Sequence, residues 1–216
     1  FQIERRGFLG LTTGVGLTLS MVSGSLQGEE ASVDTSENEL LRNKLRACLG
    51  GPWPEPCPLR PILRETIQED GYRIESLTYE VEPGERVPAM LLVPNGIDAN
   101  HPAPAIAAWH QHAGQWHLGK SELAGLAGNP MHHTGVALVK KGYVVLCPDA
   151  LCFEERQDPT GRLKGGGFEQ FEFLRYLVNG KCLAWKKILD MRRAVDYLCA
   201  RPEVQPDRIG CYGHSM

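Results

Sequence analysis

A serine near the end of the sequence stands in a setting typical of nucleophilic catalysis. Gly213, His214 and Ser215 follow Arg208 to Tyr212, a short run of strand-forming residues. In the pattern Gly-x-Ser-x-Gly the serine occupies a strained turn between a strand and a helix, and small residues two before and two after it let the backbones pass. The final glycine would be residue 217, one beyond the last residue of the sequence. We expect Ser215 to attack a carbonyl carbon.

The backbone around such a serine has its own part in the chemistry. The helix that follows the turn directs its first N–H groups, beginning with that of Met216, at the oxyanion of the intermediate. The same turn directs the neighbouring side chain of His214 away from the serine Oγ. We therefore expect Met216 to donate to the oxyanion and His214 not to be the general base.

A cluster of histidines offers a rival chemistry. Five of them fall within a short segment: His110, His112, His117, His132 and His133. Two histidines separated by one residue at the end of a strand can supply two zinc ligands. Such sites need a nearby carboxylate, and the residues that follow are Gln and Trp. The alternatives are a metal-dependent hydrolase built on His110 and His112, or histidines that hold the loop through hydrogen bonds.

Charged residues that follow the apolar run 143–147 could also lie near the serine. Asp149 comes at the end of that run, and we interpret it as a residue that orders a loop. Glu154, Glu155 and Arg156 follow and are expected to form a local ion-pair cluster at the mouth of the site, in reach of substrate. The glycine-rich segment 164–167 has no strand leading into it, which favours a flexible insertion over a phosphate-binding loop.

The elements that must position these residues follow from hydrophobic periodicity. Residues 74–81 and 87–93 alternate as strands do, and Pro83-Gly84 between them predicts an antiparallel pair. Three continuously apolar runs, 105–109, 143–147 and 208–212, predict strands buried on both faces.

Helices are predicted between these strands. The first covers 132–141, with Gly142 as its left-handed cap, and another covers 184–198. The apolar stripe of the second is expected to comprise Ala184, Ile188, Met191, Val195 and Leu198. A further helix is predicted over 40–49. Alternation of strand and helix predicts two right-handed crossovers, and hence a parallel sheet with helices on both faces.

From about Tyr72 onward the sequence resembles the α/β-hydrolase superfamily, and within it the dienelactone hydrolase and acetyl xylan esterase type. The resemblance rests on the order and spacing of segments 87–94, 109–115, 142–150, 191–198 and 201–215. It implies an α/β fold of which residues 40–216 form the N-terminal part, an antiparallel strand pair leading into a parallel sheet. It does not identify the substrate.

The resemblance also implies residue roles. Ser215 corresponds to the nucleophile, and His112-Ala113-Gly114 corresponds to a His-Gly-x turn. The N–H of Gly114 is then the second oxyanion donor, although Ala113 stands where the family has glycine. The catalytic acid and histidine of the family follow the nucleophile, so neither is assigned here.

The expected activity is that of a serine hydrolase acting on esters of small molecules or carbohydrates, as a carboxylesterase, acetyl esterase or dienelactone hydrolase, without a cofactor or metal. A non-catalytic member of the fold is a further alternative. The 216 residues alone are expected to be an inactive, poorly folded fragment, with the strand at 208–212 as an unpaired edge.

The start of the sequence resembles an export signal. Arg5-Arg6 precedes Phe8-Leu9 and a mildly apolar stretch, as in bacterial twin-arginine signals. We interpret 1–26 as this signal and 27–39 as a linker, which implies a periplasmic or extracellular protein. The alternatives are a frayed amphipathic helix and a cytoplasmic protein.

Composition excludes several other classes. The 216 residues carry a formal net charge of −3, and no apolar run reaches the ~18 residues of a membrane span. Neither a nucleic-acid binder nor a membrane-spanning protein is expected. Seven cysteines without close pairs are interpreted as mostly small buried apolar residues, in particular Cys147, Cys199 and Cys211.

Overall fold

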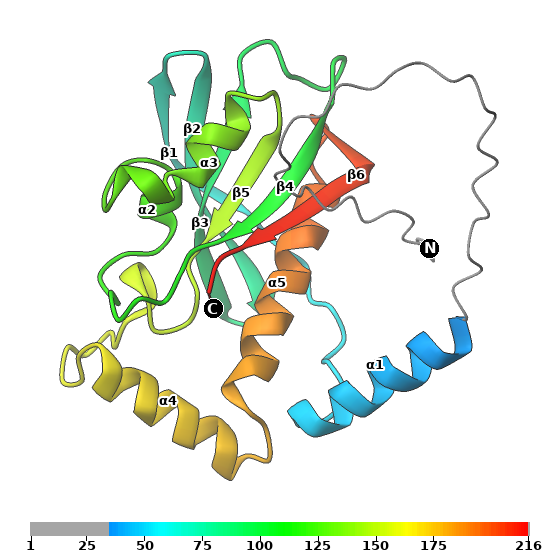
Figure 1. The fold of residues 1–216 in the computed structure, drawn as a ribbon, viewed down its shortest axis with the longest axis vertical. Helices are drawn as coiled ribbons and strands as arrows, with labels where there is room; N and C mark the ends of the chain where they lie inside the picture. Colours follow the sequence, from blue (N-terminus) through cyan, green and yellow to red (C-terminus); the bar gives the residue numbers. More distant parts are fainter. Residues whose placement is uncertain (1–34, 216) are drawn as a thin grey trace, which may run out of the picture. The chain divides into compact units, whose positions relative to one another are not determined.

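The fold is built on one mixed sheet of six strands (Figure 1). The structure, a computed structural model, describes residues 35–215. In chain order the strands are β1 (Ile62–Glu69), β2 (Tyr72–Glu82), β3 (Glu85–Pro94), β4 (Ala103–Trp109), β5 (Val144–Pro148) and β6 (Val204–Gly213). The helices are α1 (Thr35–Leu49), α2 (Lys120–Leu123), α3 (Thr134–Val139), α4 (Gly166–Val178) and α5 (Leu183–Cys199). Across the sheet the order is β1-β2-β3-β5-β4-β6.

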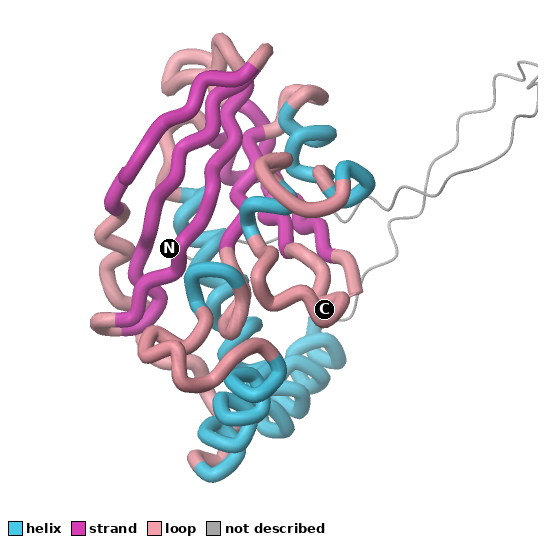
Figure 2. Tube along the Cα trace, turned by 90° about the vertical axis from the view of Figure 1, so that its left-hand side faces the viewer, coloured by secondary structure: helices cyan, strands magenta, loops and turns pink. Residues whose placement is uncertain are grey.

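The first three strands form an antiparallel meander, seen side by side in Figure 2. The predicted pair is confirmed as β2 and β3, and Gly84 in the turn between them has a φ of 79°. Strand β1 was not predicted. Its residues are mostly exposed, so it carries no buried apolar alternation that would mark it as a strand.

The other half of the sheet is parallel, as predicted. Strand β4 pairs in parallel with both β5 and β6, while β3 joins β5 in antiparallel fashion. One face packs against α5 through Ala194, Tyr197 and Leu198. The other face packs against α2 and α3 through Leu123 and Val139. Each crossover therefore covers its own face of the sheet.

Helix α5 confirms a predicted helix but not its predicted buried face. Ala184 is exposed and Met191 is half-buried, whereas Lys186 and Arg193, expected off the apolar stripe, are buried. The reason is a charged network beneath the helix: Lys186 Nζ lies 2.6 Å from Glu82 and 3.0 Å from Asp190. Charged residues with partners can thus be buried at positions that the spacing of apolar residues predicts to be exposed to solvent.

Two other helix predictions change in extent. The helix expected over 132–141 is a short 3₁₀ turn, Pro130–His132, followed by α3, and Gly142 is left-handed with a φ of 90°. Helix α1 begins at Thr35, so residues 35–39 of the expected linker are helical. The expected signal at 1–26 lies outside the described residues. Residues 46–216 form one compact unit that holds the whole sheet.

Strand β6 differs most from the expectation of burial on both faces. It pairs only with β4 among the described strands, and most of its residues are exposed or half-buried. Consequently Cys211 of β6 is exposed. Cys199 of α5 is half-buried, and Cys147 is buried as predicted. All seven cysteines lie within the described residues, and none of them forms a disulfide there.

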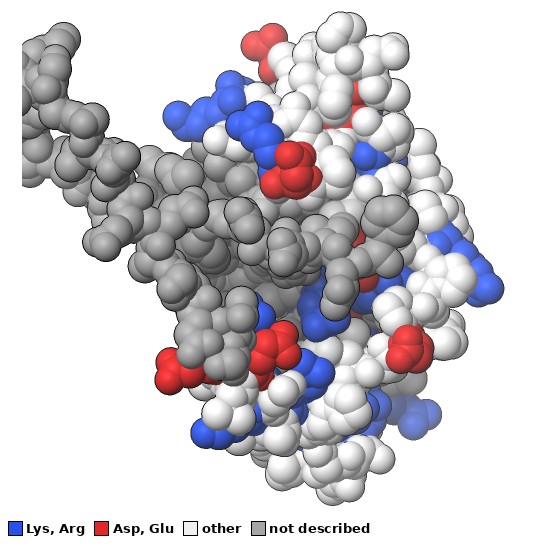
Figure 3. All heavy atoms as spheres, turned by 90° about the vertical axis from the view of Figure 1, so that its right-hand side faces the viewer, with Lys and Arg blue, Asp and Glu red and all other residues white. Residues whose placement is uncertain are grey.

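The surface carries charges of both signs. On the face shown in Figure 3, basic and acidic side chains are interspersed with uncharged ones, in keeping with a small net charge. Among the described residues, no helix has the length and apolarity needed to span a membrane.

Candidate active site

The predicted nucleophile lies at the edge of the sheet where the parallel strands end. Trp109 of β4 is in register with Gly213 of β6, so the two strands finish level with each other. Ser215 follows two residues later, is exposed, and has a φ of 69°. This left-handed conformation is uncommon for a residue with a Cβ and is the strained backbone that a nucleophile turn needs. Met216 is outside the described residues.

The glycine before this turn is not crowded in the structure. A Cβ added at Gly213 would meet no described atom within 4 Å. The steric demand that the Gly-x-Ser pattern predicts at this position is therefore not seen among residues 35–215.

His110 ties two loops of the site together. Its Nδ1 lies 2.8 Å from the carbonyl oxygen of Gln111, and its Nε2 lies 3.1 Å from the N–H of Ala150. Since the N–H must donate, Nε2 accepts and Nδ1 carries the proton. Burial lowers the pKa of His110, which keeps the ring neutral. This arrangement corresponds to the loop-holding alternative.

His112 is engaged in a similar way. Its Nε2 lies 2.8 Å from Glu169 Oε2, and the N–H of Gly114 donates to its Nδ1 at 3.0 Å. The expected oxyanion donor Gly114 therefore has its N–H bound to His112. Ala113 and Gly114 both have positive φ values, 44° and 67°, so the turn is tight and left-handed.

The histidines do not come together as a metal site in the described part of the chain. There, the group of three or more His, Cys, Asp or Glu residues found close enough for a metal is Asp149, Glu154 and Glu155. The ammonium of Lys120 lies among them, within 2.8 Å of Asp149, 2.6 Å of Glu154 and 2.8 Å of Glu155. These carboxylates thus already surround a cation.

Lys120 and Asp149 form a buried centre behind the site. Their side chains are 2% and 0% exposed, and Asp149 also accepts the N–H groups of Lys120 and Glu155. Burial by itself lowers the pKa of Lys120, but the three carboxylates raise it, and the net effect is a pKa above the ordinary value of lysine. The centre joins the start of α2 to the end of β5, so Asp149 orders loops as interpreted.

Glu155 and Arg156 contact other segments and not each other. Glu155 pairs with Lys120 and Arg64, and its pKa is lowered by these two cations despite partial burial. Arg156 is buried, 2.6 Å from Asp190 and 2.7 Å from Glu85. The local cluster expected from the sequence is a set of long-range pairs, and the Arg156 guanidinium faces the interior and not the site mouth.

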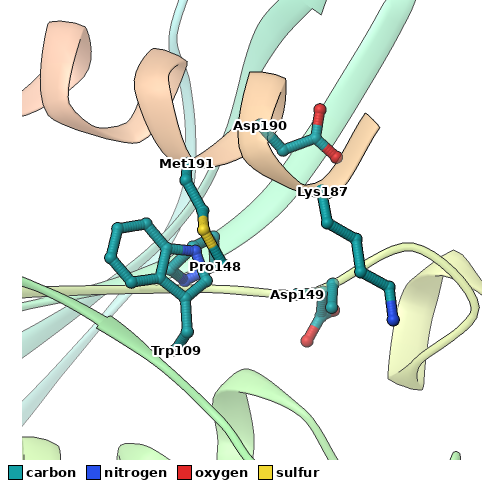
Figure 4. A pocket seen from close by; sticks show the side chains of 7 residues that line it. Trp109, Pro148, Asp149, Lys187, Asp190 and Met191 are labelled. Atoms are coloured by element: carbon teal, nitrogen blue, oxygen red, sulfur yellow. The ribbon is translucent and has the colours of Figure 1, made fainter. Parts of the chain in front are cut away.

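A small hollow lies where β4 and β5 end beneath α5, and the space in it that a water-sized molecule can occupy is about 10 Å³. Figure 4 shows Trp109 beside Met191 on one side, with Lys187 and Asp149 on the other. Ligands of open α/β sheets bind outside the carboxyl ends of the strands. Because Trp109 is level with Gly213, this hollow begins one strand away from Ser215.

Two residues of this edge were missed by sequence reasoning. Glu169 of α4 accepts from His112 across 57 positions of sequence, and Lys120 meets Asp149 across 29. Helix α4 itself was not predicted. Several of its apolar residues are exposed, so its apolar positions do not form the single buried stripe by which a helix is recognised in sequence. Neither residue belongs to a local motif that could have identified it.

Comparisons with known proteins agree with this architecture. No family model matches the chain. "Putative hydrolase YtaP" of Bacillus subtilis is 34% identical over 163 residues, which cover 73% of this chain and 50% of that protein. The chain thus spans about half the length of the curated relative that it matches.

Solved structures resemble it at lower identity. A crystal structure titled as a putative acetyl xylan esterase from Bacteroides fragilis has a TM-score of 0.70 and 21% identity, covering 83% of this chain and 47% of that one. Acetyl xylan esterase 1 from Thermoanaerobacterium has a TM-score of 0.52 at 19% identity, covering 79% and 54%. A glucuronoyl esterase from Solibacter usitatus has a TM-score of 0.51 at 17% identity, covering 84% and 52%. The chain has the α/β-hydrolase fold over the residues described.

Proposed function

We propose that the full-length protein containing this chain is a serine esterase and that Ser215 is its nucleophile. The observation that carries the proposal is the left-handed backbone of Ser215, at a φ of 69°, directly after β6 and level with the end of β4. The likeness to a curated hydrolase and to esterase structures supports the class of reaction.

The reaction proceeds through an acyl-enzyme. The Ser215 Oγ bonds to the acyl carbon of the ester as its proton passes to a general base, and the alcohol leaves carrying a proton. Water then releases the acid and restores the serine. The base and its carboxylate follow Ser215 in the resembling family. The ring of His214 stacks on that of His132, with centroids 5.9 Å apart, which supports its exclusion as the base.

The oxyanion donors are the N–H of Met216 and one N–H of the turn after β4. Gly114 can serve only if its bond to His112 Nδ1 opens. The turn begins level with the end of β6, since Trp109 pairs with Gly213.

Replacement of the serine tests the proposal. In the full-length protein, Ser215→Ala is expected to reduce hydrolysis of p-nitrophenyl acetate by roughly a millionfold with an unchanged thermal melt. The matched control is Ser76→Ala, a half-buried serine of β2. A fluorophosphonate probe should label wild type and the control but not Ser215→Ala. Activity of Ser215→Ala within tenfold of wild type would contradict the proposal.

The substrate is proposed to be an acetyl ester of a carbohydrate, since two of the matched structures are titled acetyl xylan esterases. Comparison of kcat/KM for acetylated xylan, p-nitrophenyl acetate and a dienelactone tests this assignment. A clear preference for the dienelactone would contradict it and favour the other type that the sequence resembles.

Export is a separate proposal, based on the arginine pair at Arg5 and Arg6. Residues 1–30 behind a start methionine should export a reporter in a bacterium with the twin-arginine pathway. Replacement of both arginines by lysine should block this export. Equal export of the double variant would contradict the assignment.

A further inference from the structure

The turn after β4 holds an unfavourable backbone conformation. Ala113 and Gly114 are both left-handed, and Ala113 pays a steric penalty that glycine would not. The turn is held by its own histidine, because the N–H of Gly114 donates to His112 Nδ1 at 3.0 Å. This hydrogen bond exists only while Nδ1 lacks a proton.

The tautomer that permits this bond is set by a residue from another element. Glu169 lies in the first turn of α4, and its Oε2 is 2.8 Å from His112 Nε2 and 2.9 Å from Trp116 Nε1. A carboxylate accepts hydrogen bonds and cannot donate them, so the proton of His112 must be on Nε2. Nδ1 is then free to accept from Gly114.

Helix α4 is fitted closely to this turn. A Cβ on Gly165 would come within 2.9 Å of the Trp116 ring, and one on Gly166 within 3.1 Å. The glycine-rich segment therefore lets the start of α4 lie against Trp116, which brings Glu169 to both of its ring partners. Lys187 of α5 lies 3.5 Å from the other oxygen of Glu169.

We propose that Glu169 is a positioning residue for the esterase site: acting through His112, it holds the turn at residues 112–114, which follows the end of β4, in its left-handed conformation. The inference rests on the proposed function. Because His112 occupies the N–H of Gly114, the oxyanion donor in this arrangement is another N–H of the turn. Glu169 itself touches neither Ser215 nor the reacting atoms. Its effect is exerted through the His112 tautomer and the placement of backbone N–H groups.

Three substitutions in the full-length protein separate this role from a structural one. Glu169→Leu removes the oxygen that accepts from both His112 Nε2 and Trp116 Nε1, so the His112 proton is no longer held on Nε2 and the bond from Gly114 can be lost. Glu169→Asp keeps a carboxylate. Glu172→Gln is the matched control, because Glu172 is a carboxylate of the same helix but is bound to Arg175.

Two measurements decide the proposal. In ¹⁵N-histidine NMR spectra, wild type should show His112 protonated at Nε2, and Glu169→Leu should show the tautomer protonated at Nδ1. With p-nitrophenyl acetate, Glu169→Leu should lower kcat about 10- to 100-fold with KM within threefold, since small misplacements near reacting groups have effects of this order. Glu169→Asp should lower kcat less than Glu169→Leu does, by no more than about 20-fold. Glu172→Gln should match wild type.

Other results would overturn it. An unchanged His112 tautomer in Glu169→Leu, an unchanged kcat in that variant, or an equal loss in Glu172→Gln would each refute the role of Glu169. Failure of the esterase proposal is recognised separately, because Ser215 would then not react with the fluorophosphonate, whereas the NMR spectra would still report the link from Glu169 to His112.

Discussion

Removal of the buried ammonium of Lys120 is expected to destabilise the fold above neutral pH, where Asp149 is ionised in wild type. In Lys120→Met the side chain keeps nearly the same length but loses a charge that lies within 2.8 Å of Asp149, 2.6 Å of Glu154 and 2.8 Å of Glu155. The Asp149 side chain is 0% exposed, so water cannot replace the lost partner. Leaving a buried charge unpaired in this way costs about 3 to 5 kcal/mol.

Protonation of Asp149 sets a ceiling on this loss. The pKa of Asp149 is raised from 3.8 to about 7 by burial, although Lys120 opposes the shift. Without Lys120 the carboxyl enters the folded state protonated. Wild-type Asp149 is itself about half protonated at pH 7, so protonation limits the loss to less than about 1 kcal/mol at pH 7 and to about 3 kcal/mol at pH 9, at ~1.4 kcal/mol for each pH unit above its pKa. We therefore expect Lys120→Met to lower the free energy of unfolding by about 2 to 3 kcal/mol at pH 9.

The pH dependence of the loss has a definite sign. In the variant, Asp149 is protonated when folded and ionised when unfolded, so the unfolded state binds fewer protons. Above about pH 7, where wild-type Asp149 is ionised, the stability of the variant relative to wild type then falls as pH rises, by up to about 1.4 kcal/mol per unit. The deficit should be smaller at pH 7 than at pH 9.

Urea denaturation of the full-length protein at pH 7 and 9 measures both effects. Lys140→Met, at an exposed position after α3, is the control and should change stability by less than about 0.5 kcal/mol. Adding Asp149→Asn to Lys120→Met should recover more than half of the loss at pH 9, since the unpaired charge is removed as well. A loss below about 1 kcal/mol at pH 9, or a deficit that grows toward pH 7, would refute the reasoning.

Three further predictions concern the neighbouring structure. Gly165→Ala should lower the free energy of unfolding by about 1 to 3 kcal/mol, because it adds a Cβ at a φ of 50° and within 2.9 Å of Trp116. Gly167→Ala is the control: its Cβ would have no neighbour within 4 Å, so chemical denaturation should show an unchanged or higher stability. Equal effects of the two substitutions would contradict the packing argument. The hydrogen bonds from Trp116 and His112 lower the pKa of Glu169 below its ordinary 4.5 even though burial raises it, so the stability difference between wild type and Glu169→Gln should be constant above about pH 5.5 and shrink as pH falls below 4.5. A difference that widens in acid would show that the folded state does not favour the ionised form. EDTA should leave esterase turnover unchanged, and inactivation that zinc reverses would instead support the histidine-based metal hydrolase.

Local sequence was enough to predict much of the sheet. Alternation and the Pro83-Gly84 turn predicted β2 and β3, and three apolar runs predicted β4, β5 and β6. These signals work because strand and turn conformations depend on neighbouring residues. The Gly213-x-Ser215 pattern likewise predicted a serine just beyond a strand end, and its backbone strain is a local property of the turn.

Burial was predicted less well, because it depends on what packs against each element. Lys186 and Arg193 are buried on α5 because carboxylates and carbonyl groups of other segments meet them there. Strand β6 is exposed because it has one neighbour among the described strands. Periodicity along a single element carries no information about either circumstance.

The partners of the site residues were decided by tertiary structure alone. Glu169 reaches His112, and Lys120 reaches Asp149, because the crossovers bring the loops after β4 and β5 and the start of α4 to the same edge of the sheet. An isolated Glu or Lys in the sequence is most simply read as a solvated charge. What turns these two into bonded groups is the meeting of distant segments at that edge, and Lys120, which is buried there, is stable as a charge only with its partners in place.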